Sequence, residues 1–371
     1  MNLFANVHGL VLEALASLQS TRALPEGLDF KNVTVEAPRD SSHGDMSTNA
    51  AMILAKQAKM RPREIADLLL KKLESNTQIE HIEVAGPGFL NLTLSKNIWL
   101  EAIPQIVKLN KEFGRSSIGK EKRVNVEFVS ANPTGPIHVG HTRGAVFGDA
   151  LANLLGFAGY NVTREYYIND GGAQIDILAR SVYLRYLEAN GIAVEFIEGT
   201  YPGEYLIPVG ESLKEGFGDV FVEADEAEWL PKFRAHAVRS MMELIESDLL
   251  SLGIKMDVFY SEKSLYGTGR IETALEELSA KGLIYEGYLD PPKGKLPEDW
   301  EPRKQTLFRS SEYGDDVDRP IKKSDGQWTY FAPDIAYHYD KISRKFDHLI
   351  NIFGADPVSY THLTLPTILL V

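Results

Sequence analysis

Residues 124–155, VNVEFVSANPTGPIHVGHTRGAVFGDALANLL, decide the fold, and residues 124–130 alternate in the period of two that is typical of a strand. The loop 132–136 cannot continue that strand, because its prolines lack the amide donor that a sheet ladder needs. From Gly140 onward, apolar residues recur at intervals of three and four, which predicts a helix with one buried stripe. The stripe consists of Val146, Phe147, Ala150, Leu151, Leu154 and Leu155. Strand, loop and helix in this order predict the first unit of a nucleotide-binding α/β fold.

Two histidines, His138 and His141, stand at the mouth of the expected helix, with Gly140 between them. A helix N-terminus offers free amide groups and the positive end of a dipole to phosphate. Imidazole N–H groups can stabilise phosphate oxygens that gain charge during attack on an α-phosphate. A bare HxGH pattern is equally compatible with solvated or helix-capping histidines. A zinc site is disfavoured, because the sequence has no cysteine and no third ligand nearby. The flanking strand and helix favour the nucleotide site.

The composition is that of an ordinary globular protein with two or three domains: 371 residues, 44% hydrophobic and 25% charged. The formal net charge of −13 argues against indiscriminate nucleic-acid binding, although a local basic face remains compatible with it. The absence of cysteine excludes disulfides and thiol chemistry and fits a cytoplasmic location. No stretch approaches the ~20 apolar residues of a membrane span, and the N-terminus lacks the pattern of a signal peptide.

Residues 1–110 are predicted to form a small α+β domain. Its pattern contains an N-terminal helix, a strand at 33–37, a helix capped by Ser47 or Thr48, a helix opened by Pro62, and two strands around a Gly-Pro-Gly turn. Residues 111–123 are polar and basic, which predicts a linker into the nucleotide-binding fold.

A second strand and helix, at 161–168 and 173–187, follow the first unit. Two such units in succession favour a parallel sheet whose ligands bind beyond the carboxyl ends of the strands. The pattern then loosens between about 192 and 305, where an acidic region and a helix at about 232–252 are read as an insertion.

The segment 324–341, SDGQWTYFAPDIAYHYDK, is a second candidate for chemistry. We expect a short strand at 328–331 and then a helix, opened by Pro333, on which Asp334, Tyr337 and His338 share a face. A carboxylate backed by a phenol hydroxyl suits a guanidinium group. Taken alone, Asp334 would more simply favour its helix by its charge near the N-terminus.

SANPTGPIHVGH and TRGAVFGDALANLLGFAGYNVTREYYINDGGAQ resemble the first half of the catalytic domain of bacterial arginyl-tRNA synthetases. These are class I aminoacyl-tRNA synthetases, and HVGH stands where that class carries its HIGH signature. The resemblance extends over residues 7–356 and implies an α/β fold. Residues 124–356 would form the first half of a class I synthetase nucleotide-binding parallel sheet (Rossmann-like, HUP-type). An N-terminal α+β domain that contacts tRNA would precede it. It also implies ATP-dependent activation of L-arginine and transfer to tRNA-Arg, with Mg²⁺ accompanying ATP and no tightly bound cofactor or separate metal site.

The resemblance also implies roles for individual residues. His138 and His141 would stabilise the phosphate charge, and the ATP contacts would be completed by Pro133, Gly135 and Gly140. Tyr330 and Asp334 would hold the guanidinium group. The α-amino and carboxylate groups of arginine would be held by Glu127, Ser130 and Asn132.

The chain departs from the family after Asp356, because the tail 357–371, PVSYTHLTLPTILLV, resembles nothing in it. A KMSKS-type loop and an anticodon-binding domain do not follow. The expectation is therefore a C-terminally truncated, monomeric cytoplasmic synthetase with an unrelated tail and no membrane partner. Two alternatives stay open: a fragment that binds arginine or tRNA without turnover, and an HxGH nucleotidylyltransferase, which would not need the pocket around Asp334.

Overall fold

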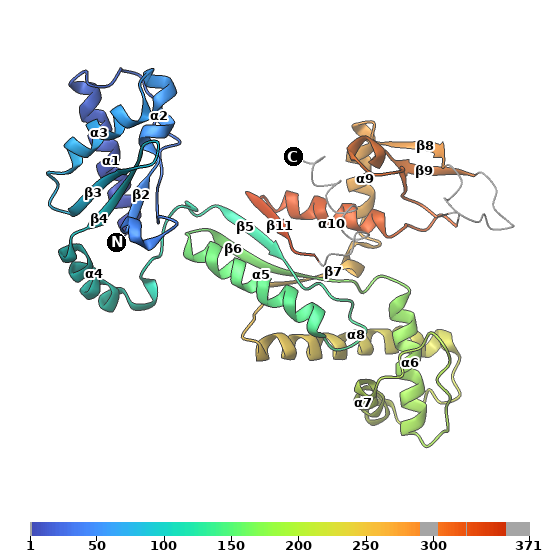
Figure 1. Cartoon of the computed structure of the whole chain (residues 1–371). Coiled ribbons are helices and arrows are strands. Elements are labelled where there is room, and N and C mark those ends of the chain that lie inside the picture. The colour runs from blue at the N-terminus through green and yellow to red at the C-terminus, as the bar shows by residue number, and fades with distance from the viewer. Residues whose placement is uncertain (1, 290–302, 324, 354–371) are drawn as a thin grey trace. The chain divides into compact units, whose positions relative to one another are not determined.

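Figure 1 shows the computed structural model of the chain, which describes residues 2–289, 303–323 and 325–353. Contacts between residues divide the chain into two compact units, Met1–Arg115 and Ser116–Val371, and each is described by itself. The predicted tail 357–371 and part of the predicted insertion lie outside the described residues. The domain boundaries at 110 and 123, with the linker between them, stay predictions.

The first unit is an α+β domain, as the sequence predicts. Its antiparallel sheet has the order β1-β2-β4-β3, and α1, α2 and α3 pack against it around an apolar core. The elements are α1 (Leu3–Ser20), β1 (Val35–Glu36), η1 (Ser41–His43), β2 (Met46–Thr48), α2 (Ala50–Ala58), α3 (Pro62–Leu73), β3 (Ile79–Ala85), β4 (Phe89–Leu94), α4 (Lys96–Leu109) and η2 (Asn110–Glu112).

The helix cap predicted at Ser47 or Thr48 is wrong, because both residues belong to β2. The buried, β-branched Thr48 pairs with Val35 on one side and with Leu90 on the other. The helix that follows has Asn49 at its N-cap position. Tertiary pairing therefore takes these residues into the sheet, although their side chains are those of a cap.

The second unit is built on a four-stranded parallel sheet of order β11-β5-β6-β7. This confirms the predicted nucleotide-binding α/β fold. Along β5, Val124 and Val126 face an apolar core shared with α5 and α8, whereas Asn125 and Glu127 face α10. Figure 1 shows α5 and α8 on one side of the sheet and α10 on the other. These core elements are β5 (Arg123–Glu127), α5 (Val139–Phe157), β6 (Asn161–Ile168), α6 (Gln174–Ala189), α8 (Glu226–Ser251), β7 (Val258–Ser261), α10 (Phe331–Ser343) and β11 (His348–Asn351).

The region predicted as an insertion, about 192–305, contains β7, which pairs with β6 in the core sheet. Before β7 the chain forms a helical cluster with α6, and after it a small antiparallel sheet of order β10-β9-β8. The remaining elements are η3 (Glu204–Leu206), α7 (Ile207–Phe217), η4 (Glu262–Leu265), α9 (Arg270–Ala280), β8 (Ile284–Tyr288), β9 (Lys304–Phe308), η5 (Ser310–Tyr313) and β10 (Arg319–Pro320).

The predicted helix at the HVGH motif is confirmed as α5, but its predicted buried stripe is wrong. The buried positions are Ala145, Gly148 and Ala152, whereas Phe147 and Leu154 are 61% and 67% exposed. A Cβ atom at position 148 would lie 2.2 Å from the Phe128 ring. The helix therefore turns its smallest residues toward the sheet, because only they permit this close approach.

The strand predicted at 328–331 is also wrong. Trp328 makes a single bridge with Lys322, and α10 already begins at Phe331. Pro333 lies within the first turn of α10, where a backbone N–H has no partner within the helix, so the proline costs the helix no hydrogen bond. Asp334, Tyr337 and His338 share a face of α10, because they stand at positions i, i+3 and i+4 of this helix; Tyr337 and His338 are buried, and Asp334 is partly exposed.

Candidate active site

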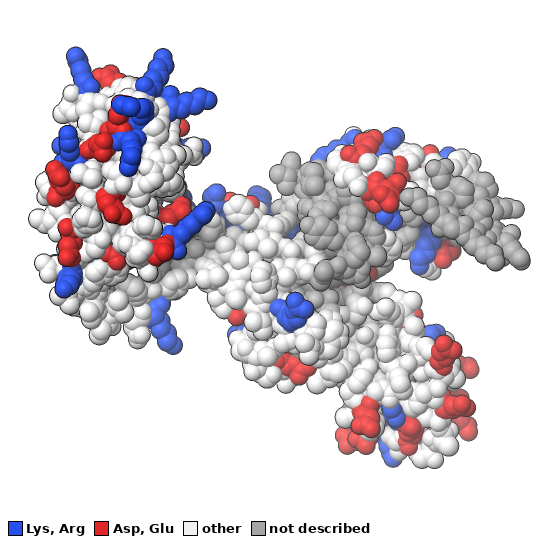
Figure 2. Space-filling view, viewed as in Figure 1, with Lys and Arg blue, Asp and Glu red and all other residues white. Residues whose placement is uncertain are grey.

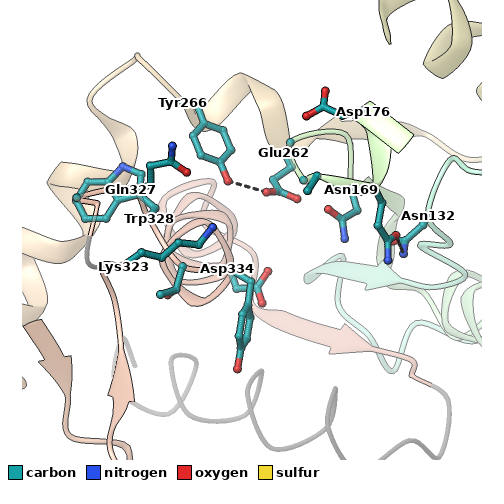
Figure 3. Close-up of a pocket in the computed structure, with 16 residues that line it drawn as sticks. Asn132, Asn169, Asp176, Glu262, Tyr266, Lys323, Gln327, Trp328 and Asp334 are labelled. Carbon is teal, nitrogen blue, oxygen red and sulfur yellow. Dashed lines mark hydrogen bonds between the residues drawn. The ribbon is translucent and has the colours of Figure 1, made fainter. Parts of the chain in front are cut away.

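A cavity of about 780 Å³ lies beyond the carboxyl ends of the parallel strands. In the view of Figure 3, Asp334 and Glu262 lie between the loop that carries Trp328 and the loop after β5 that carries Asn132. The loop after β6 is tied to the segment that carries Glu262, because Asp170 accepts hydrogen bonds from Ser261 Oγ (2.7 Å) and Lys263 N (2.8 Å). The cavity is thus framed by the ends of β5, β6 and β7 and by the start of α10.

The acidic centre of this cavity consists of Asp334 and Glu262. Burial, followed by the charges of Glu262 and Glu127, raises the pKa of Asp334 to about 8. Burial also raises the pKa of Glu262. The hydrogen bond that Tyr266 donates to Glu262 Oε1 (2.9 Å) lowers this pKa, but burial has the larger effect. Carboxyl groups that interact in a site of low dielectric resist ionisation together and favour a cation between them.

Tyr330 also lines the cavity, at the N-cap position of the helix that carries Asp334. Burial of the phenol raises the pKa of Tyr330. The charge of Arg319 acts in the opposite direction, and the charge of Asp334 raises this pKa further. The predicted guanidinium residues Tyr330 and Asp334 are therefore brought together. Glu262 is an acidic residue of this site that the sequence patterns do not predict.

The backbone after β5 has an unusual conformation near the residues that are predicted to hold the α-amino and carboxylate groups of arginine. Val129 and Ser130 adopt φ values of +69° and +42°, and Ser130 N donates to Phe128 O over 3.0 Å. A left-handed conformation is rare for a β-branched residue and costs free energy, so it persists only where surrounding contacts impose it. Two such contacts come from β6: Tyr167 N donates to Ser130 Oγ (3.0 Å), and Tyr166 Oη donates to Ala131 O (2.8 Å).

Asn132 lies on the cavity wall, and its Nδ2 donates to Gln174 Oε1 over 2.8 Å. This bond directs the amide nitrogen of Asn132 toward the first residue of α6. Three residues, Glu127, Ser130 and Asn132, are predicted to hold the amino and carboxylate groups of arginine. Of these three, Asn132 lines the cavity directly.

Glu127 lies deeper, under Ser130, and is only 4% exposed. Its Oε1 accepts a hydrogen bond from Ser130 Oγ (3.1 Å), and its Oε2 contacts the Lys341 ammonium and accepts from Tyr337 Oη (3.1 Å). The carboxylate thus already has a cationic partner inside the protein. This position lets it orient Ser130, which is a different contact from the direct one predicted.

The two histidines cap the helix that follows them. His138 is the N-cap residue of α5, and its Nδ1 accepts from Gly140 N (3.1 Å), while His141 Nδ1 accepts from His138 N (3.4 Å). The rings stack with centroids 3.7 Å apart. Because Nδ1 is the acceptor in both rings, each neutral imidazole carries its proton on Nε2. Burial, and then the neighbouring His138, lowers the pKa of His141, which favours this neutral form.

Gly140 leaves room for the His138 ring of the stacked pair. A Cβ atom there would lie 2.9 Å from the His138 ring. The preceding loop, which contains Pro133 and Gly135, is held by Tyr205, whose hydroxyl donates to Thr134 O (2.8 Å). The histidines do not belong to the residues that line the cavity; they lie at the start of α5.

Comparison with known proteins agrees with this geometry. Residues 5–94 match the family model of the arginyl-tRNA synthetase N-terminal domain, and residues 102–363 match that of the class I (R) tRNA synthetase catalytic domain. The chain belongs to the class I arginyl-tRNA synthetase family. This confirms the resemblance seen in the sequence, while the roles of individual residues stay predictions.

Relatives of known sequence and structure support the assignment to this family. An arginine–tRNA ligase of Ruegeria pomeroyi is 66% identical over 360 residues, which are 97% of this chain and 62% of that protein. A Campylobacter jejuni structure described as an arginyl-tRNA synthetase is 36% identical, with a TM-score of 0.64, over 75% of this chain and 57% of that one. The Plasmodium falciparum arginyl-tRNA synthetase, 17% identical, shares the fold with a TM-score of 0.61, over 99% of this chain and 62% of that one. The chain spans about 62% of the length of the curated relatives it matches.

Proposed function

We propose that the chain forms the amino-acid-binding and ATP-binding part of an arginine–tRNA ligase. The observation that carries this proposal is the acidic pair Asp334 and Glu262 in the cavity at the carboxyl ends of the parallel strands. A guanidinium group is planar and permanently charged, and it would relieve the mutual repulsion of the two carboxyls.

In this proposal, Asp334, Glu262 and Tyr330 hold the guanidinium group of L-arginine. Asn132 and Ser130 hold its α-amino and carboxylate groups, and Glu127 acts through Ser130. Arginine would therefore lie along the cavity, with its carboxylate toward the end of β5 and hence toward the start of α5.

ATP would bind at the loop that contains Pro133, Gly135 and Gly140, with its α-phosphate near the histidines. A carboxylate oxygen of arginine then attacks the α-phosphorus, and the bond to pyrophosphate breaks. The Nε2–H groups of His138 and His141 would donate to the phosphate oxygens and stabilise the charge that they gain, by position and electrostatics. The arginyl group would next pass to the terminal adenosine of tRNA-Arg.

Mg²⁺ would enter with ATP as part of the substrate, held largely by phosphate oxygens. The residues that the structure describes contain no group of three or more side chains suited to a metal ion. Within the same residues, no helix is long and apolar enough to cross a membrane. A monomeric state and a cytoplasmic location belong to the proposal as well.

The proposal is tested by arginine-dependent exchange of pyrophosphate into ATP, together with calorimetric measurement of arginine binding. For His138→Ala we expect unchanged arginine affinity and an exchange rate lower by about two to three powers of ten, because the phosphate oxygens then have one donor fewer. His81→Ala, at an exposed position of β3, is the matched control. An unchanged exchange rate in His138→Ala would contradict the role of this histidine.

A second candidate is a binding unit without turnover. It is favoured by the position of the histidines outside the cavity lining. In that case the unaltered chain binds arginine in the calorimeter and shows no exchange.

A further inference from the structure

One face of α10 carries four polar side chains at successive turns: Asp334, Tyr337, Lys341 and Arg344. Asp334 lines the cavity, and the other three reach down to the parallel sheet. Residues at these spacings lie one above another on a helix, so the same face that meets the ligand is also attached to the strands.

The attachment is a set of buried contacts with two paired carboxylates. Glu127 and Glu165 are direct neighbours in the register of β5 and β6. The Tyr337 hydroxyl lies 3.1 Å from Glu127 Oε2 and 2.9 Å from Glu165 Oε1, so it can donate to either. Both terminal nitrogens of Arg344 donate to Glu165 at 2.7 Å.

Lys341 is fully enclosed, with 0% of its side chain exposed. Its ammonium contacts Glu127 and donates to Asn351 Oδ1 (2.8 Å) at the end of β11. A buried ion pair is weak evidence for stability, because apolar residues of similar volume often do as well. Such a pair is more readily understood as a device that fixes one geometry.

The geometry that it fixes joins the two ends of the proposed arginine site. Glu127 contacts Tyr337 and Lys341 with one carboxylate oxygen and accepts from Ser130 with the other. Ser130 belongs to the strained segment proposed to hold the amino-acid end, and Asp334 lies one turn before Tyr337. One carboxylate therefore links Ser130, two residues before Asn132 on the cavity wall, to the helix that carries Asp334.

We propose that Tyr337, Lys341 and Glu127 act as positioning residues that set the distance between Asp334 and Ser130, so that the cavity selects a guanidino amino acid of one side-chain length. This inference rests on the proposed arginine-binding function. Arginine would be preferred over L-homoarginine, which is one methylene longer, and over L-2-amino-4-guanidinobutyrate, which is one methylene shorter.

The test is calorimetric titration of the full chain with these three amino acids. For the unaltered chain we expect arginine to bind about tenfold or more tightly than either homologue, the discrimination typical of one methylene. In Tyr337→Phe, and in the double variant Glu127→Gln with Lys341→Met, we expect the preference to fall to about threefold or less, because the helix can shift against β5. The control, Lys345→Met, changes an exposed lysine just beyond α10 and keeps the original preference.

The outcomes are separable. Variants that bind all three amino acids more weakly but in unchanged proportion would show that these side chains merely support the fold, and would overturn the inference. If the double variant does not fold, Tyr337→Phe decides the matter, because it removes a single hydroxyl and keeps the ring. An unaltered chain that binds none of the three would instead refute the proposed function, and the length selection with it.

Discussion

At Asp334, burial and two neighbouring carboxylates hold a proton on a side chain that would be ionised in water. Its pKa in the folded protein, about 8, lies above the value of ~3.9 in an unfolded chain, so the folded form is largely protonated at neutral pH. A guanidinium group needs the ionised carboxylate. Binding must therefore displace this proton.

Arginine binding is accordingly expected to release about one proton near pH 7, and its affinity is expected to rise with pH until about pH 8 and then level off. Calorimetry in two buffers of different ionisation enthalpy measures the proton count directly. Asp334→Asn, which has no proton to lose, should abolish the release. Binding without net proton transfer in the unaltered chain would argue against Asp334 as the guanidinium partner.

The residues of the site differ in how far the sequence could predict them. Asp334 and Asn132 follow from motifs, because their neighbours along the chain define the helix start and the loop. Glu262 and Lys341 could not be found in this way. Only the fold brings these two residues to the site, because they follow Glu127 in the sequence by 135 and 214 positions respectively. A lone acidic or basic residue also carries no local sequence signal.

At the scale of elements, α5 depends on how closely it approaches β5. Ala is normally the better helix former, yet a Cβ atom at Gly148 would lie 2.2 Å from Phe128. Gly148→Ala is therefore expected to destabilise the protein by about 1–3 kcal/mol through overpacking, measured by urea unfolding.

The same helix provides the control, because nothing lies within 4 Å of a Cβ atom built at Gly144. Gly144→Ala should stabilise the protein by about 0.5–1 kcal/mol, since it only removes the flexibility of glycine. Equal effects of the two substitutions would show that α5 and β5 do not approach each other as closely as described.

Element boundaries show where sequence patterns fail for physical reasons. The helix predicted after Pro231 is α8, which starts earlier, at Glu226, and runs through the proline. Glu226 and Glu228 favour a helix N-terminus by their charge, and burial of Trp229 offsets the one hydrogen bond that the proline cannot make. The buried stripe on α5 was predicted from hydrophobicity, whereas the residues of α5 that are buried against the sheet are the small ones. The order of strands and helices around the HVGH motif was correct, since it depends on local periodicity.

At the scale of the whole molecule, the charge is unevenly divided. Residues 1–115 contain 13 Lys or Arg and 13 Asp or Glu, so the formal net charge of −13 belongs entirely to residues 116–371. Figure 2 shows Lys and Arg side chains gathered over the α2 and α3 end of the first unit. The exposed basic residues there include Lys56, Lys59 and Arg63. The first unit is therefore the better suited of the two to meet a polyanion.

If this surface binds tRNA, Lys59→Gln with Arg63→Gln should weaken tRNA binding and lower the slope of log affinity against log salt by about 0.9 for each phosphate that is no longer neutralised. Filter binding over a range of salt concentrations measures both quantities. Lys345→Gln, in the second unit, is the control. An unchanged slope would place the tRNA-binding surface elsewhere.

Recognition of a guanidinium group through Asp334 can be measured by comparing L-arginine with L-citrulline in calorimetric titrations. Citrulline has nearly the same shape but carries a neutral ureido group. We expect the unaltered chain to bind arginine about 100-fold or more tightly than citrulline, because only arginine pairs with the Asp334 carboxylate, and we expect Asp334→Asn to lose this preference. Equal affinity for the two ligands, or an undiminished preference in Asp334→Asn, would contradict this role of Asp334.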